Sequence, residues 1–189
     1  MYIENISKIG TLGNDVNDVT CSILAVKSLG ASFDIVPFQA FELAEKSLIA
    51  EEFDAMVVPG AYPQISKFIM NSLLIVFGVY TFIIPPLVLA SKSCTLKNDY
   101  STLYNHPATN PLSADVNTKW NFQVNVASNT VACLEAIKDP YDCCVITNAA
   151  CARRYGLYIH QTLREGINMP FIVFIKNRNQ WNEKGEGWQ

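Results

Sequence analysis

VNVASNTVACLEAIKDPYDCCVITNAACARRYGL, residues 124 to 157, contains two polar turns, each followed by a helical pattern of apolar residues. Ser128 precedes the first pattern, which stops before Pro140 because proline cannot continue a helix. The apolar run 143–146 is typical of a short buried strand. Asn148 precedes the second helix, and Gly156 follows its last turn. The stretch therefore predicts a buried strand between two helices.

The two helix starts in this stretch indicate a candidate binding site. A side-chain oxygen at a helix start is in the first place an N-cap. Two such starts joined by one strand also bring free N–H groups and partial positive charge together, which suits a carboxylate or a phosphate. We therefore expect a pocket for a small anionic ligand. The residues expected to bind its carboxylates are Ser128, Asn129, Thr130, Thr147 and Asn148.

The N-terminal half alternates strands with helices. Strands are predicted at residues 3–12, 32–36 and 53–58, and helices at residues 19–29 and 41–49. Such alternation is typical of a mostly parallel sheet with helices on its faces. Tyr62 comes just past the third strand, at the end of an α/β sheet where ligands bind. An ordinary loop with Tyr62 packed on the surface is an equally good interpretation.

Residues 68–91 carry no charge and approach the length of a membrane span. Two prolines, Pro85 and Pro86, interrupt this stretch, and it is rich in β-branched and aromatic residues. These features favour two consecutive buried strands over a membrane helix. Further strands are predicted at residues 121–126, 159–163 and 171–175.

Bulk composition excludes several classes of protein. Half of the residues are hydrophobic and 16% are charged, which is typical of a globular chain, and the formal net charge of −3 argues against nucleic-acid binding. The first ten residues lack the apolar region of a secretory signal, so we expect a cytoplasmic protein whose six cysteines are reduced thiols. The cysteine spacing fits no zinc pattern and the chain has two histidines, so we expect no metal site.

Several short motifs, taken in order, resemble the prephenate dehydratase-like family. Within it, the chain is most similar to the small prephenate decarboxylases of antibiotic and peptide pathways, such as those of bacilysin and aeruginosin synthesis. The resemblance covers roughly residues 11–176 and rests on VPGAY at 58–62, NHP at 105–107, YD at 141–142, TN at 147–148, ARRYGL at 152–157 and INMPF at 167–171.

The resemblance implies a two-lobed α/β fold of the type II periplasmic-binding-protein kind. It implies a single catalytic domain without a regulatory domain. Lobe one would comprise about residues 1–85 and 160–189, and lobe two about residues 86–159. Related catalytic domains often pair, so a homodimer is expected by analogy.

Departures from the dehydratase pattern change the expected chemistry. Only Gly13 remains of the family's Gly-Pro-x-Gly-Thr loop, and Met169-Pro170-Phe171 replaces the catalytic Thr-Arg-Phe. The family assigns to that threonine the proton donated to the leaving hydroxide, and Met169 has no proton to give. The resemblance therefore implies a cofactor-free decarboxylation of prephenate that keeps the ring hydroxyl and avoids aromatisation, in secondary metabolism.

The roles of individual residues follow from the resemblance. An apolar wall of Tyr62, Met169 and Phe171 would favour departure of the carboxylate. The ring proton would come from His106 or from Tyr62, and the sequence does not choose between them. His106 is also interpretable as a histidine that holds its own loop.

Two more residues were assigned to the substrate. Gly13 would lie against it, and Arg153 would anchor the pyruvyl carboxylate. The position of Arg153, one turn into a helix, also suits a solvated side chain. Two other functions remain open: a prephenate dehydratase with relocated catalytic groups, and a non-catalytic module that binds a small anion.

Overall fold

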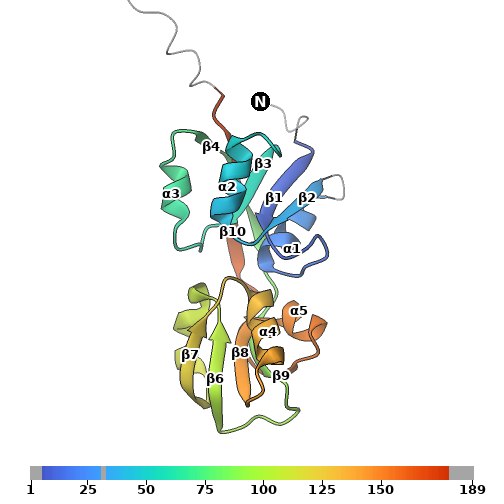
Figure 1. Ribbon diagram of the computed structural model, residues 1–189, viewed down its shortest axis with the longest axis vertical. Coiled ribbons are helices and arrows are strands. Elements are labelled where there is room, and N and C mark those ends of the chain that lie inside the picture. Colours follow the sequence, from blue (N-terminus) through green and yellow to red (C-terminus); the bar gives the residue numbers. More distant parts are fainter. Residues whose placement is uncertain (1–5, 31–32, 179–189) are drawn as a thin grey trace, which may run out of the picture.

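The chain crosses twice between two five-stranded sheets, and each sheet with its helices forms one lobe (Figure 1). The computed structural model describes residues 6–30 and 33–178. Parts of the predictions that fall outside these ranges are the first residues of strand 3–12, the start of strand 32–36 and the end of lobe one after residue 178. Two mixed sheets with helices in two lobes confirm the predicted α/β fold class.

Lobe one contains the sheet with strand order β2-β1-β3-β10-β4. Its strands are β1 (Lys8–Leu12), β2 (Asp34–Phe38), β3 (Ala55–Pro59), β4 (Leu74–Ile83) and β10 (Asn168–Lys176). Its helices are α1 (Cys21–Lys27), α2 (Phe41–Ile49) and α3 (Ile65–Ile69). The predicted helix at 41–49 matches α2, whereas α1 is shorter than predicted because Thr20 caps its start and the chain turns at Ser28.

Lobe two contains the sheet with strand order β7-β6-β8-β5-β9. Its strands are β5 (Leu87–Ser91), β6 (Asp99–Asn105), β7 (Lys119–Asn125), β8 (Cys143–Asn148) and β9 (Tyr158–Arg164). Its helices are α4 (Asn129–Lys138), α5 (Ala149–Arg154) and the 3-10 helix η2 (Pro107–Asp115). Residues 124–157 thus form the end of β7 and then α4, β8 and α5 in that order.

Both sheets are mixed, which corrects the prediction of a mostly parallel sheet. β1 pairs parallel with β2 and β3, but β10 runs antiparallel to β3 and β4. In lobe two, β6 pairs parallel with β7 and β8, while β5 runs antiparallel to β8 and β9. In lobe one the opposing strand is β10, on which the chain returns, and in lobe two it is β5, on which the chain enters.

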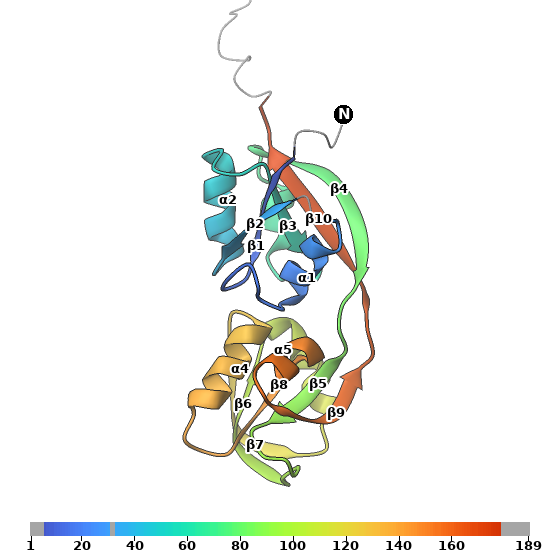
Figure 2. The same ribbon diagram turned by 90° about the vertical axis from the view of Figure 1, so that its right-hand side faces the viewer.

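Two neighbouring segments connect the lobes, one from β4 to β5 and one from β9 to β10 (Figure 2). They are joined where the amide of Ile84 donates to the carbonyl of Ile167 over 3.0 Å. Pro85 and Pro86 lie in the first connection, and proline removes a backbone donor and fixes its backbone angle. The break predicted at these prolines is therefore the crossing point between the lobes.

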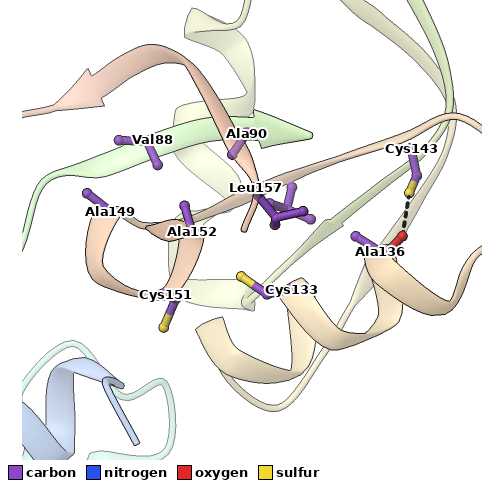
Figure 3. Packing of buried hydrophobic residues seen from close by; sticks show 10 residues of the cluster. Val88, Ala90, Cys133, Ala136, Cys143, Ala149, Cys151, Ala152 and Leu157 are labelled. Carbon is purple, nitrogen blue, oxygen red and sulfur yellow. Dashed lines mark hydrogen bonds between the residues drawn. The ribbon is translucent and has the colours of Figure 1, made fainter. Parts of the chain in front are cut away.

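Small side chains bring the helices of lobe two close to its sheet. A buried cluster of alanines, cysteines and a few larger residues packs α4 and α5 against β5 and β8 (Figure 3). Within it, the Cys143 thiol donates to the carbonyl of Ala136 at 3.2 Å. All six cysteines are free thiols, and those in this cluster act as small apolar groups.

Strand β4 is less buried than predicted. It is the last strand of its sheet, and Val79 and Ile83 are 59% and 67% exposed. An edge strand with one open face leaves alternate side chains in solvent, whatever their hydrophobicity. In the described part of the chain, no helix has the length and apolar character needed to cross a membrane.

Candidate functional site

A cleft between the lobes is the candidate site. It is lined from lobe one, from both connections and from lobe two. Its lining residues are Leu12, Thr20, Cys21, Ser22, Phe41, Pro59, Ala61, Tyr62, Ile84, Leu87, His106, Ala108, Thr109, Ser128, Asn129, Ile167, Met169 and Phe171. Six of the residues predicted from the sequence meet here from distant parts of the chain, namely Tyr62, His106, Ser128, Asn129, Met169 and Phe171.

The cleft is small and mostly apolar. Its volume is about 130 Å³, close to the roughly 150 Å³ of an engineered apolar cavity that holds benzene. A single six-membered ring therefore fits in the cleft. Among the described residues that line the cleft there is no Asp, Glu, Lys or Arg. A ligand in this form of the cleft is thus held by neutral donors and apolar contacts.

Tyr62 offers its ring to the cleft while its hydroxyl points at another residue. The hydroxyl donates to the Glu42 carboxylate over 2.7 Å. The ring packs edge-on against Phe41 at 4.9 Å between centroids and stacks on Phe68 at 5.9 Å. Burial, and then the hydrogen bond to Glu42 and its negative charge, raise the pKa of the phenol well above its usual value. Tyr62 is therefore placed as part of an apolar wall and is a poor proton donor.

His106 is held as a neutral imidazole. It caps the start of η2, where its Nδ1 accepts the amide of Ala108 at 3.2 Å. An Nδ1 that accepts a hydrogen bond carries no proton, so the proton of the neutral ring is on Nε2. Burial lowers the pKa of the ring below its usual value of 6.5. His106 therefore holds its loop, as one of the two interpretations has it, and its Nε2–H is free to donate a hydrogen bond to a ligand.

The start of α4 contributes the polar side of the cleft. Ser128 is the predicted N-cap, and its hydroxyl oxygen accepts the amide of Val131 at 3.1 Å. The Asn129 amide nitrogen contacts the sulfur of Cys21 at 3.6 Å. The Asn129 Oδ1 is buried and has no hydrogen-bond partner among the described residues. A buried acceptor without a partner costs free energy, so a donor on a ligand would satisfy it.

Three other residues predicted to bind the ligand do not line the cleft, because each bonds to protein groups. The Thr130 hydroxyl donates to Asp18 at 2.6 Å, and the Thr147 hydroxyl donates to the carbonyl of Asn129 at 3.1 Å. Asn148 caps α5 as predicted, accepting the amide of Cys151 at 2.8 Å. All three residues are kept from the ligand for one physical reason: their hydrogen-bonding groups at these helix starts are already bonded to groups of the protein.

Gly13 and Arg153 also lie outside the lining of the cleft. A Cβ at Gly13 would come within 2.7 Å of the Ile23 side chain, so the packing of α1 against the preceding loop accounts for this glycine. Arg153 is exposed on α5, in keeping with the solvated interpretation. Gly156 has a positive φ of 67° and ends α5, as predicted from the sequence.

Met169 and Phe171 enter the cleft from β10. Phe171 is fully buried between Tyr80, stacked at 5.7 Å, and Phe82, edge-on at 6.3 Å. Met169 is half-buried on the same strand and lines the cleft with its thioether, which donates no proton. The side of the cleft formed by β10 is therefore apolar throughout.

Sequence reasoning missed four polar residues of the lining, namely Thr20, Cys21, Ser22 and Thr109. The first three form the start of α1, and only the polar run before an apolar helical pattern could have indicated them. Burial raises the pKa of Cys21 to about 11, so this residue is a neutral thiol at pH 7. Within residues 6–30 and 33–178, no group of three His, Cys, Asp or Glu side chains could hold a metal ion.

Comparison with known proteins places the chain among solved structures of the same shape. No protein-family model matches the chain, and no curated protein matches its sequence. A prephenate dehydratase from Arthrobacter aurescens, in complex with L-Phe, is 15% identical with a TM-score of 0.66, over 90% of this chain and 60% of that one. The chain thus spans well under two thirds of the length of that dehydratase.

Two further solved structures define the range of functions found on this fold. The prephenate dehydratase of Staphylococcus aureus is 15% identical with a TM-score of 0.63, over 91% of this chain and 67% of that chain. A periplasmic substrate-binding protein of an ABC transporter from Coxiella burnetii is 14% identical with a TM-score of 0.54, over 95% of this chain and 88% of that chain. The chain therefore has the two-lobed α/β fold that prephenate dehydratases share with type II periplasmic binding proteins.

Proposed function

We propose that this protein is a cofactor-free lyase that removes carbon dioxide from prephenate without aromatising the ring. The observation that carries the proposal is the composition of the cleft, which is sized for one six-membered ring and apolar along β10. By the sequence resemblance, Met169 replaces the threonine that donates a proton in dehydratases. Supporting it is the likeness of the fold to prephenate dehydratases.

The proposed reaction breaks one carbon–carbon bond. The bond between the quaternary ring carbon and its carboxylate breaks, carbon dioxide leaves, and the electron pair spreads over the ring diene. A proton added to a ring carbon completes the reaction, and the ring hydroxyl stays in place. An apolar cleft favours the first step, because a localised carboxylate loses more solvation there than the delocalised anion that follows.

Two features of the cleft oppose loss of the hydroxyl. Expelling hydroxide requires a nearby acid that protonates the leaving oxygen, and the Met169 side chain carries no acidic proton. The phenol of Tyr62 is bonded to Glu42, and His106 is held neutral by the amide of Ala108.

Since neither side chain has a proton ready to give, we propose that the ring proton comes from water. His106 then donates a hydrogen bond to a substrate oxygen through Nε2–H.

Product analysis tests this proposal directly. The purified protein is incubated with prephenate at neutral to mildly basic pH, where spontaneous aromatisation is slow, and the product is followed by ultraviolet absorbance and mass. We expect a product that has lost carbon dioxide and kept its hydroxyl. Phenylpyruvate as the main enzymatic product would refute the proposal and support a dehydratase.

A second candidate is a module that binds a small carboxylated ring without turnover. The buried Asn129 Oδ1, which has no partner among the described residues, favours it, because a donor on a bound ligand would satisfy this oxygen without any proton transfer. The fold is also that of substrate-binding proteins. Calorimetric titration separates the two candidates, since heat of binding with unchanged prephenate supports the module.

A further inference from the structure

In the part of the chain that the structure describes, the side-chain hydrogen bonds that cross between the lobes converge on one segment of lobe one, residues 17–21, which we call the clasp segment. The Thr130 hydroxyl donates to Asp18 at 2.6 Å, and Arg154 donates to the carbonyl of Asn17 at 2.7 Å. Asn148 donates to the carbonyl of Val19 at 3.0 Å. The clasp segment therefore bonds to the first residues of α4 and to both ends of α5.

Asp18 is the central group of the clasp segment. Its side chain is buried, with 1% of the residue exposed. One carboxylate oxygen accepts the amide of Asn14 at 2.8 Å. The other accepts the amide of Val19 at 2.7 Å and the hydroxyl of Thr130. A buried carboxylate needs such donors, and Thr130 is the one that comes from the opposite lobe.

The geometry of the clasp segment explains why Thr130 does not line the cleft. The second residue of α4 is Thr130, and its hydroxyl already has an anionic partner in Asp18. A carboxylate thus does lie at this helix start, bonded through the Thr130 hydroxyl, but it belongs to the protein. The remaining polar groups of that helix start, on Ser128 and Asn129, face the cleft.

We propose that Asp18 is a positioning residue that clasps lobe two through Thr130 and keeps the cleft closed before any ligand binds. Figure 2 shows the layout: the connecting strands run along one side of the molecule, and α1, which follows the clasp segment, lies over α5. The lobes are joined covalently at the connections and by hydrogen bonds at the clasp segment. A ligand reaches the cleft when the clasp opens, and binds a site that is already assembled when it recloses.

Small-angle X-ray scattering of the ligand-free protein tests the proposal without reference to any substrate. The variants are Asp18→Asn and Thr130→Val. Two controls match them: Asp15→Asn, an exposed carboxylate of the same loop that accepts the amide of Asn17, and Thr11→Val, a buried hydroxyl bonded within lobe one to Val57. We expect a larger radius of gyration for both clasp variants and an unchanged value for both controls.

Amide hydrogen exchange is a second measurement, and exchange in the opposite lobe would not change if Asp18 acted only within its own loop. Opening of the clasp raises exchange in residues 14–22 of lobe one and in residues 128–132 of lobe two, in both clasp variants. Because Thr130→Val leaves Asp18 and its loop intact, it decides the question even where Asp18→Asn fails to fold. A folded Thr130→Val variant with wild-type scattering and wild-type exchange in residues 14–22 would overturn the proposal.

Discussion

The truncation Asn129→Ala should make the ligand-free protein more stable while weakening its site. Asn129 Oδ1 is buried without a partner in the described structure, which costs about 1–3 kcal/mol. The truncation removes that cost, and alanine is the better helix former by roughly 0.5 kcal/mol. Against this gain stands one weak contact to the Cys21 sulfur at 3.6 Å, which contributes less than about 1 kcal/mol. The net expectation is a gain of about 1 kcal/mol.

Asn148→Ala is the matched control, with the opposite sign. Asn148 is also an asparagine at a helix start, but both ends of its amide are bonded, to the amide of Cys151 at 2.8 Å and to the carbonyl of Val19 at 3.0 Å. Loss of the N-cap costs about 1 kcal/mol, and loss of the second buried bond about another 1 kcal/mol. The two variants should therefore differ by about 3 kcal/mol in free energy of unfolding.

Urea unfolding, followed by circular dichroism, measures this difference for the ligand-free protein. A shift of midpoint without a change of slope reports a change in stability. The reasoning is refuted if Asn129→Ala loses as much stability as Asn148→Ala. That result would mean that the oxygen of Asn129 has a partner in the free protein, such as an ordered water molecule, and that it is not held ready for a ligand.

Three further predictions concern the cleft. Because burial lowers the pKa of His106 below 6.5, the unfolded chain binds a proton at His106 at a higher pH than the folded chain does. The stability that neutral His106 contributes is therefore present above pH 6.5 and is lost as the pH falls through the lower folded pKa. Unfolding measured from pH 7.5 to 5 should therefore show a smaller loss in His106→Asn, with a remainder from His160, whose pKa is also lowered by burial. Met169→Thr places a hydroxyl on the apolar side, so mass analysis should find more phenylpyruvate from prephenate; an unchanged product ratio would contradict the role given to Met169. Tyr62→Phe should keep turnover within about threefold of wild type, since its hydroxyl serves Glu42, and a loss beyond about a hundredfold would show that this hydroxyl does act on the substrate.

Local chemistry made much of the fold predictable. Ser128 and Asn148 cap the helices that the sequence assigned to them, and Gly156 ends α5 with a positive φ. Pro85 and Pro86 break the apolar run where the chain crosses between lobes. Each of these residues acts on its immediate neighbours, and so its effect can be read from a short window of sequence.

Pairing between distant segments was not predictable in the same way. Nothing within the N-terminal alternation of strands and helices signals that β10, more than a hundred residues later, inserts between β3 and β4. That insertion makes the sheet mixed and brings Met169 and Phe171 into the cleft. Strand order depends on contacts of high sequence separation, and the alternating pattern of one strand is silent about its partner.

In the candidate site, too, the local features were predictable from the sequence and the contacts between distant segments were not. The free N–H groups at a helix start need hydrogen-bond acceptors, and the two helix starts predicted from the sequence are correct. The sequence did not show which acceptor would arrive, because Asp18 lies 112 residues from Thr130 in the chain. The expectation of an anion at α4 was therefore chemically sound, yet the anion at Thr130 is internal.

The carboxylate bonded to Thr130 is that of Asp18 and not of a ligand, and this affects the chemistry that the cleft can support. With Asp18 bonded to Thr130 and no charged residue in the described lining, a substrate carboxylate meets neutral donors in place of a cation. A carboxylate held weakly in an apolar cleft is destabilised relative to water, and a reaction that disperses its charge relieves that destabilisation. A binding protein gains nothing from the same arrangement, since it needs the carboxylate itself to be stabilised. The uncharged cleft thus supports the proposed decarboxylation more than the proposed storage of an anion, and this proposal predicts a low affinity for prephenate whenever turnover is high.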